Sequence, residues 1–184
     1  MAGNAKHRIL EGALDLLRVE GGGNITLDAA AKQVGVTKPG LMYHFPTKEA
    51  LMIAVVDHVA ARWETLLGER LGQPVETATP QERIRSYVQV ALTEHFDRAD
   101  YAICCDALYR DALTEAWTRR LGPWLDLPAD LPAPVHGRLT AARLLADGYW
   151  TAAATGVFPV PERDRDLLLA VADELLADEG EGAS

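Results

Sequence analysis

The stretch Thr26–Leu51, TLDAAAKQVGVTKPGLMYHFPTKEAL, decides the fold of the N-terminal part of this chain. Thr26 and Thr37 each precede a short helical pattern, and a threonine hydroxyl in that position accepts a backbone N–H of the first helical turn. Gly35 interrupts the first pattern and Pro46 ends the second. The spacing therefore predicts two short helices, over about 27–34 and 38–45, joined by a turn at Gly35.

Two short helices of these proportions predict a helix-turn-helix motif. In such a motif the second helix enters the major groove of DNA, and its N-terminal residues meet base edges. Gly40 has no side chain, so the backbone could approach DNA closely there. Leu41 and Phe45, four residues apart, are expected to face a small core that includes Ala30, Ala31 and Val34.

The outer side of the second helix is expected to face phosphate. Tyr43 and His44 fall on that side, where a phenol and an imidazole can donate to phosphate oxygens. Lys48 lies at the start of the next helix, whose N-terminal N–H groups also attract anions.

This stretch resembles the DNA-binding signature of the TetR family of bacterial transcriptional regulators, through the pieces VGVT, LMYHF and KEAL. The resemblance covers about residues 6–55 and departs from the family pattern at Val34 and Met42. It implies a homodimer that presents two recognition helices one DNA turn apart to a near-palindromic operator. It also implies repression that ends when a small molecule binds the C-terminal domain. The candidate DNA-binding residues are Thr26, Thr37, Lys38, Pro39, Gly40, Leu41, Tyr43, His44 and Lys48.

Each of these residues also has an ordinary structural interpretation. Thr26 and Thr37 could be helix caps and nothing more, and Tyr43 could be a core aromatic residue. His44, like the lysines of the motif, could be a solvated surface group. The motif as a whole is better supported than any single member, because its caps and its spacing agree.

The charge of the chain is unevenly distributed. The formal net charge is −9, but residues 1–50 hold six Lys/Arg against five Asp/Glu, which gives +1 and leaves −10 for the remainder. All four lysines lie in those first fifty residues. This distribution is expected if only the N-terminal part meets phosphate.

The remainder of the chain alternates helical patterns with short Pro/Gly breaks. Helices are expected over about 9–19, 50–71, 81–97, 138–155 and 163–177, and one or two helices over 101–121. The proline-rich segment 122–137 is expected to be a loop. No segment shows the alternation of a strand. The predicted fold is all-α, with about nine helices: a three-helix DNA-binding domain over residues 1–50 and a larger ligand-binding and dimerisation domain over 51–184.

The C-terminal part suggests a pocket between helices and an interface between two copies. Its aromatic residues, with acidic residues nearby, would favour a flat or cationic lipophilic ligand, although any one ring could be ordinary core. The pocket candidates are Tyr87, Cys104, Trp117, Tyr149 and Trp150. The last two helices are apolar on more than one face, which suggests burial against a second copy, with intramolecular packing as the alternative. The interface candidates are Leu139, Ala142, Leu145, Ala146, Ala153, Leu168, Val171 and Leu175.

Other functional classes find little support in the sequence. We expect no enzyme, cofactor or metal site, since no nucleophile–base pair, phosphate loop or metal-ligand spacing is present, and the histidines outside the motif are scattered: His7, His58, His95 and His136. No apolar run suggests a membrane span and no signal peptide is evident, so a cytoplasmic location is expected. A helical enzyme or a protein-interaction module that retains the N-terminal helices remains the alternative.

Overall fold

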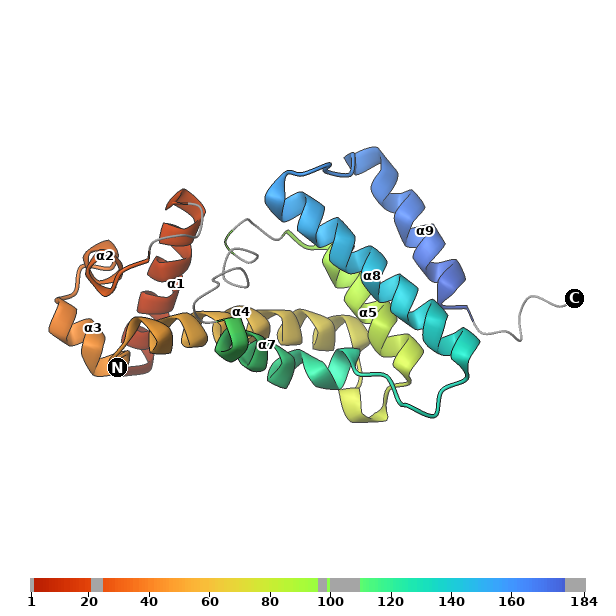
Figure 1. Ribbon diagram of the computed structural model, residues 1–184, viewed down its shortest axis with the longest axis horizontal. Coiled ribbons are helices and arrows are strands. Elements are labelled where there is room, and N and C mark those ends of the chain that lie inside the picture. The colour runs from red at the N-terminus through yellow and green to blue at the C-terminus, as the bar shows by residue number, and fades with distance from the viewer. Residues whose placement is uncertain (1, 21–24, 96–98, 100–109, 178–184) are drawn as a thin grey trace, which may run out of the picture. The chain divides into compact units, whose positions relative to one another are not determined.

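The computed structural model describes residues 2–20, 25–95, 99 and 110–177, and all regular secondary structure in these residues is helical (Figure 1). These residues form eight α-helices and two short 3₁₀ helices, where about nine helices were expected. None of the eight is long and apolar enough to cross a lipid bilayer. The α-helices are α1 (Ala2–Glu20), α2 (Leu27–Gln33), α3 (Lys38–His44), α4 (Lys48–Leu71), α5 (Pro80–Thr93), α7 (Arg110–Leu125), α8 (Ala133–Thr155) and α9 (Arg165–Leu175), and the 3₁₀ helices are Val75–Thr77 and Glu162–Asp164.

The chain divides into two compact units. One unit comprises residues 1–62 and 97–120, and the other comprises residues 63–96 and 121–184. Helices α4 and α7 each contribute residues to both units. The domain boundary between residues 50 and 51 stays a prediction.

The first unit has a small core where α1 packs on α2 and α2 packs on α3. Its buried side chains are those that helical spacing places on the inner faces of the four N-terminal helices. Gly12 of α1 lies so close to α2 that a β-carbon there would stand 2.2 Å from Cγ1 of Val34. Core residues of this unit include Ile9, Ala13, Leu14, Leu17, Ala30, Ala31, Leu41, Phe45, Leu51, Met52, Val55 and Val56.

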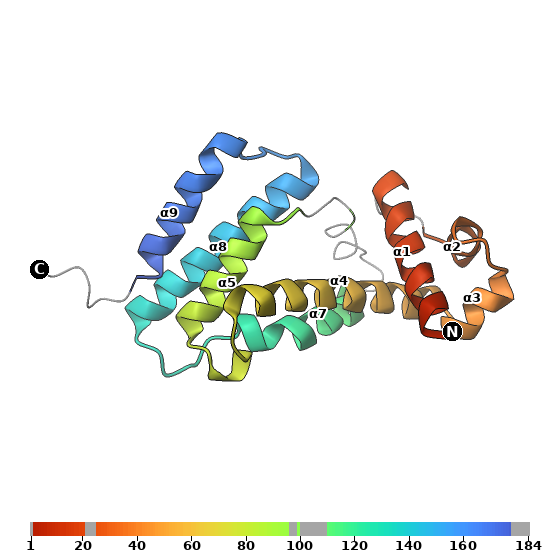
Figure 2. The same cartoon turned by 180° about the vertical axis from the view of Figure 1, so that it is seen from behind.

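The second unit is organised around α5 and α8, and α9 packs on both of them (Figure 2). Helix α5 begins with a capping box, because Thr79 Oγ1 accepts the amide N–H of Glu82 while the Glu82 carboxylate accepts the amide N–H of Thr79. Arg85 of α5 donates to the backbone carbonyl of Leu176, just after α9. These contacts hold the end of α9 against α5.

The prediction of a loop over residues 122–137 is wrong at both ends of that range, where the chain is helical. Helix α7 continues to Leu125 and includes Pro123, and α8 already begins at Ala133. Arg83 supports the end of α7, because its guanidinium donates to the backbone carbonyls of Pro123 and Asp126. Pro134 lies in the first turn of α8, where a missing backbone N–H costs little. The connection between the two helices is therefore shorter than the prolines suggested.

Candidate functional site

The predicted helix-turn-helix is present as α2, a turn at Gly35, and α3. Thr26 Oγ1 accepts the amide N–H of Ala29 at 3.1 Å, and Thr37 Oγ1 accepts that of Gly40 at 3.2 Å. Both threonines are therefore helix caps, as their spacing predicts. Gly35 has a φ of 69°, in the left-handed region that glycine adopts without steric cost.

Helix α3 has one buried face and one exposed face. Leu41 and Phe45 are 0% and 3% exposed, so they form the inner face together with Ala30 and Ala31 of α2. The assignment of Leu41 to base contact is therefore wrong, because a fully buried side chain cannot reach DNA. Its position four residues before Phe45 explains the burial, since that spacing returns to the same side of a helix.

The outer face of α3 presents most of the other candidates to solvent. Tyr43 is 85% exposed, and its ring meets that of His44 edge to face with centroids 5.2 Å apart. His44 and Lys48 are half-buried. The remaining candidates, Thr26, Thr37, Lys38, Pro39 and Gly40, are all exposed.

Two features of this surface have consequences for binding. The Lys38 ammonium lies 2.8 Å from a carboxylate oxygen of Asp28, so any base contact by Lys38 must compete with this exposed ion pair. A β-carbon on Gly40 would lie 3.2 Å from Thr37 Oγ1, so glycine also protects the helix cap. Gly40 thus has a structural reason to be small, in addition to the close backbone approach that the sequence suggested.

Two of the C-terminal ligand candidates meet in the second unit. Tyr87 of α5 and Trp150 of α8 both contact Trp63 of α4, which the sequence analysis did not single out. The rings of Trp63 and Tyr87 are stacked at 5.4 Å, and those of Trp63 and Trp150 meet edge to face at 5.7 Å. Among these rings, Trp150 is the most exposed, at only 8%. The result is a buried aromatic cluster in the second unit, made of Trp63, Tyr87 and Trp150.

A carboxylate lies beside this aromatic cluster. The Tyr87 hydroxyl donates to Oδ1 of Asp147 at 2.6 Å, and Arg143 donates to Oδ2 of the same carboxylate at 2.9 Å. Tyr149 is half-buried on α8, Trp117 belongs to the first unit, and Cys104 lies outside the described residues.

Two family models match this sequence over its two functional regions. The model described as "Bacterial regulatory proteins, tetR family" matches residues 9–55, which contain the helix-turn-helix. The model described as "Tetracyclin repressor-like, C-terminal domain" matches residues 81–177, which is more than half of the chain. The chain belongs to the TetR family.

Characterised relatives resemble this TetR-family chain over part of its length. It is similar to the HTH-type transcriptional regulator RutR of Escherichia coli strain K12, with 31% identity over 105 residues. That alignment covers 56% of this chain and 48% of RutR, so the chain spans about half the length of the curated relative that it matches.

Solved structures share the fold at low sequence identity. A regulator from Rhodococcus sp. described as TetR-family has a TM-score of 0.67 at 16% identity, with 94% of this chain and 98% of that chain covered. The multidrug binding protein EbrR, complexed with imidazole, has a TM-score of 0.61 at 20% identity, with 97% and 98% covered. Both are similar to this chain in fold.

The interface candidates of this TetR-family chain fall into two groups. Leu139, Ala142 and Ala146 are at most 1% exposed within the chain itself, so their assignment to a dimer interface is wrong. They lie on α8, which packs against α5, and periodicity alone could not separate that face from an intermolecular one. The other candidates keep some exposure: Leu145, Leu168 and Leu175 are half-buried, and Ala153 and Val171 are exposed.

Two large apolar side chains were missed on the same helices. Leu144 of α8 is 54% exposed and Leu167 of α9 is 64% exposed. Both lie on helices that already carried interface candidates, and this was the signal that could have found them. The sequence could not show which side of each helix faces solvent. We name Leu144, Leu167 and Val171 the exposed apolar surface of α8 and α9.

Proposed function

We propose that this chain is a ligand-responsive transcriptional regulator that binds double-stranded DNA through α3. The exposed face of that helix carries the proposal, because Tyr43 is 85% exposed while Leu41, two residues earlier, is fully buried. A large aromatic group held outward on a helix with a fixed inner face is suited to contact a partner surface. The excess of lysine in residues 1–50, against an acidic remainder, supports a phosphate-bearing partner.

The contacts follow from the positions of the side chains. Tyr43, His44, Thr26 and Lys48 would contact phosphate, which fixes the register of the protein on the duplex. Thr37, Lys38, Pro39 and Gly40 would lie toward base edges in the major groove. Lys38 would exchange its ion pair with Asp28 for a base or a phosphate.

The test is a titration of labelled duplex from the region upstream of the gene, measured by fluorescence anisotropy at several salt concentrations. Wild-type protein should form a salt-sensitive, sequence-selective complex. Lys48→Ala should weaken binding to all duplexes about equally and reduce the salt slope by about one per subunit. Arg163→Ala is the matched control, since it removes one positive charge from an 85% exposed side chain of the second unit.

Lys38 provides a second, sharper test. Lys38→Ala should change the preference among operator variants, because a base contact contributes roughly 1–3 kcal/mol of discrimination. Asp28→Asn should tighten binding to every duplex, because it releases the Lys38 ammonium and removes one negative charge. If Lys38→Ala and Lys48→Ala both leave operator affinity intact, the assignment of α3 to the major groove is wrong.

The effector is proposed to be a small lipophilic molecule, with a lipophilic cation as the best match. The aromatic cluster of Trp63, Tyr87 and Trp150 offers aromatic rings, and a cationic ligand would compete with Arg143 for the Asp147 carboxylate beside it. EbrR, which shares the fold, has been solved with imidazole and with ethidium, and this supports the same ligand class. A panel of lipophilic cations and neutral isosteres, scored by release of the operator and by tryptophan fluorescence, tests the preference for charge.

The working form is proposed to be a cytoplasmic homodimer that represses transcription. The exposed apolar surface of α8 and α9 supports dimerisation, because these two helices pack on each other and each carries large apolar side chains that are open to water. The double variant Leu144→Glu/Leu167→Glu should dissociate in sedimentation velocity, whereas Val19→Glu, at an 84% exposed position of α1, should not. A double variant that sediments like the wild-type protein would contradict this interface.

A further inference from the structure

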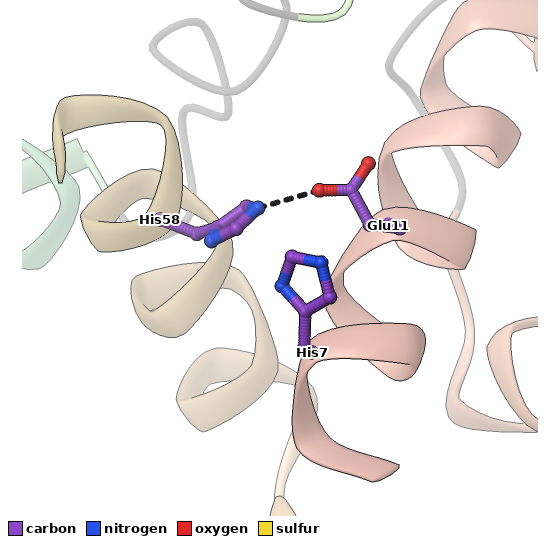
Figure 3. A group of neighbouring side chains, drawn as sticks. All are labelled: His7, Glu11 and His58. Carbon is purple, nitrogen blue, oxygen red and sulfur yellow. Dashed lines mark hydrogen bonds and ion pairs between the residues drawn. The ribbon is translucent and has the colours of Figure 1, made fainter. Parts of the chain in front are cut away.

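Three side chains that could bind a metal ion meet between α1 and α4 in the first unit (Figure 3). His7 and Glu11 come from successive turns of α1, and His58 comes from α4. Each offers one ligand atom, and these three atoms all lie within 4.8 Å of one another. No local pattern predicts this group, because 47 positions separate Glu11 from His58.

The helices explain why the three side chains meet. His7 and Glu11 are four residues apart, so they project from the same side of α1. Ile9 and Ala13, on another side of α1, are buried in the core. In Figure 3 the His58 ring points from α4 toward the Glu11 carboxylate, with the His7 ring beside both. The rings of His7 and His58 have centroids 5.2 Å apart.

We propose that His7, Glu11 and His58 form a binding site for a divalent late transition-metal ion such as Zn²⁺. Two imidazoles and one carboxylate are a ligand set that this ion takes in proteins, with a fourth position left for water. Imidazole nitrogen also selects this class over Mg²⁺ and Ca²⁺, which prefer oxygen ligands. The site would bridge α1 and α4, and the proposal does not depend on DNA binding.

The distances require only small movements of side chains. In a tetrahedral zinc site with ligand bonds of roughly 2.0–2.2 Å, neighbouring ligand atoms lie about 3.3–3.6 Å apart. His58 Nε2 and Glu11 Oε1 are now 2.6 Å apart in a direct hydrogen bond, so an ion would separate them slightly. Ligand atoms that are farther apart than this would have to approach each other from a separation of at most 4.8 Å. Rotations about side-chain bonds can supply both changes, because the His7 ring is exposed and the Glu11 side chain is 46% exposed.

The surroundings open the proposed site to solvent. His7 and Glu11 line a surface hollow of about 320 Å³, together with Arg8, Gly12, Asp15, Gln33 and Val34. Arg8, beside His7 in the sequence, donates to the carbonyl of Val34. The Lys6 ammonium lies 5.7 Å from the centroid of the Phe45 ring. Each of these two cations therefore has a contact outside the three proposed ligands, although Arg8 also lines the hollow.

The competing explanation is structural. The His58–Glu11 hydrogen bond alone could tie α1 to α4, with His7 as a bystander. The two explanations differ over His7, which takes no part in that hydrogen bond and which a metal ion would require. Substitution of His7 should leave folding intact, since the side chain is exposed.

The experiment measures Zn²⁺ binding to the full chain, purified without a histidine tag, by isothermal titration calorimetry in a non-coordinating buffer. Wild-type protein should bind one Zn²⁺ per chain. His7→Ala, His58→Ala and Glu11→Gln should each weaken binding more than about tenfold, since even partners of metal ligands contribute 10–100-fold. His136→Ala, which removes an exposed histidine of α8, is the matched control and should bind as the wild type does.

Thermal unfolding supplies an independent measurement. Zn²⁺ should raise the Tm of the wild type and of His136→Ala, because an ion that binds only the folded state stabilises it. It should leave the Tm of His7→Ala nearly unchanged. The proposal is overturned if His7→Ala binds Zn²⁺ as tightly as the wild type, or if the double variant His7→Ala/His58→Ala retains the wild-type stoichiometry and affinity.

Discussion

The contact between Gly12 and Val34 gives the sharpest test of how the first unit is packed. Gly12 lies in the interior of α1, and a β-carbon there would stand 2.2 Å from Cγ1 of Val34 and 3.4 Å from Cγ of Gln33. The Val34 side chain is β-branched, so its rotation away from the added β-carbon is restricted. The change Gly12→Ala therefore forces α1 and the end of α2 apart.

Two opposing contributions set the change in the free energy of unfolding that Gly12→Ala causes. Alanine in place of glycine in a helix interior stabilises by about 1 kcal/mol. An added methyl group in a packed site costs roughly 1–3 kcal/mol, and a 2.2 Å separation between carbons belongs at the upper end of that range. The net expectation is a loss of about 2 kcal/mol. For a chain of this length, that loss lowers the Tm by about 4–8 °C.

The assay is thermal unfolding followed by circular dichroism at one fixed protein concentration, since dimerisation makes the Tm concentration-dependent. Gly68→Ala in α4 is the matched control, because no atom lies within 4 Å of its added β-carbon. That control should raise the Tm by about 2–4 °C. In the double variant Gly12→Ala/Val34→Ala, the loss caused by Gly12→Ala should largely disappear. If Gly12→Ala alone stabilises the protein as Gly68→Ala does, the described packing of α1 on α2 is wrong.

Three further changes test other contacts. Asp57 accepts hydrogen bonds from Arg120 at 2.8 and 2.9 Å, and these bonds lower the pKa of its carboxyl although partial burial opposes them. Asp57→Asn should therefore destabilise the protein at neutral pH. The difference in urea midpoint between the variant and the wild type should shrink as the pH falls below 3.8, the ordinary pKa of the carboxyl, and through the lowered pKa. A difference that stays constant with pH would exclude the Asp57–Arg120 pair as its source. Thr79→Ala removes the side-chain cap of α5 and should cost about 1 kcal/mol in urea unfolding, whereas Thr65→Ala, at an exposed position within α4, should cost less than about half of that. Tyr87→Phe removes the hydrogen bond to Asp147 and should cost about 1–2 kcal/mol by the same measurement, and an unchanged midpoint would show that this bond contributes nothing.

Local signals predicted the helix-turn-helix well, because its chemistry is contained in a few neighbouring residues. The caps at Thr26 and Thr37, the break at Gly35 and the end near Pro46 all depend on side chains within four positions of the backbone groups that they affect. The predicted ends of α2 and α3 are therefore within one residue of the observed ends. Helical spacing also predicted that Leu41 faces the core together with Phe45. Only the additional assignment of Leu41 to the DNA-binding residues was wrong.

Long-range packing decided what the sequence could not. The apolar residues of α8 fit both an internal face and an external face, and only the position of α5 shows that Leu139, Ala142 and Ala146 face inward. The end of α7 depends on Arg83, about forty positions away. The cluster of His7, Glu11 and His58 depends on the crossing of two helices. Each of these features requires a contact between elements that no local pattern encodes.

The position of α3 itself depends on contacts outside the helix. A helix of seven residues, Lys38–His44, is too short to be stable alone in water, so its stability must come from tertiary contacts. Leu41 and Phe45 supply the buried side of α3, and Lys6 of α1 lies over the Phe45 ring. The direction in which Tyr43 points is therefore fixed partly by α1, although α1 holds none of the candidate DNA contacts. Substitutions in α1, such as Gly12→Ala, are expected to alter DNA affinity through the placement of α3, without the loss of any contact that α1 makes to DNA.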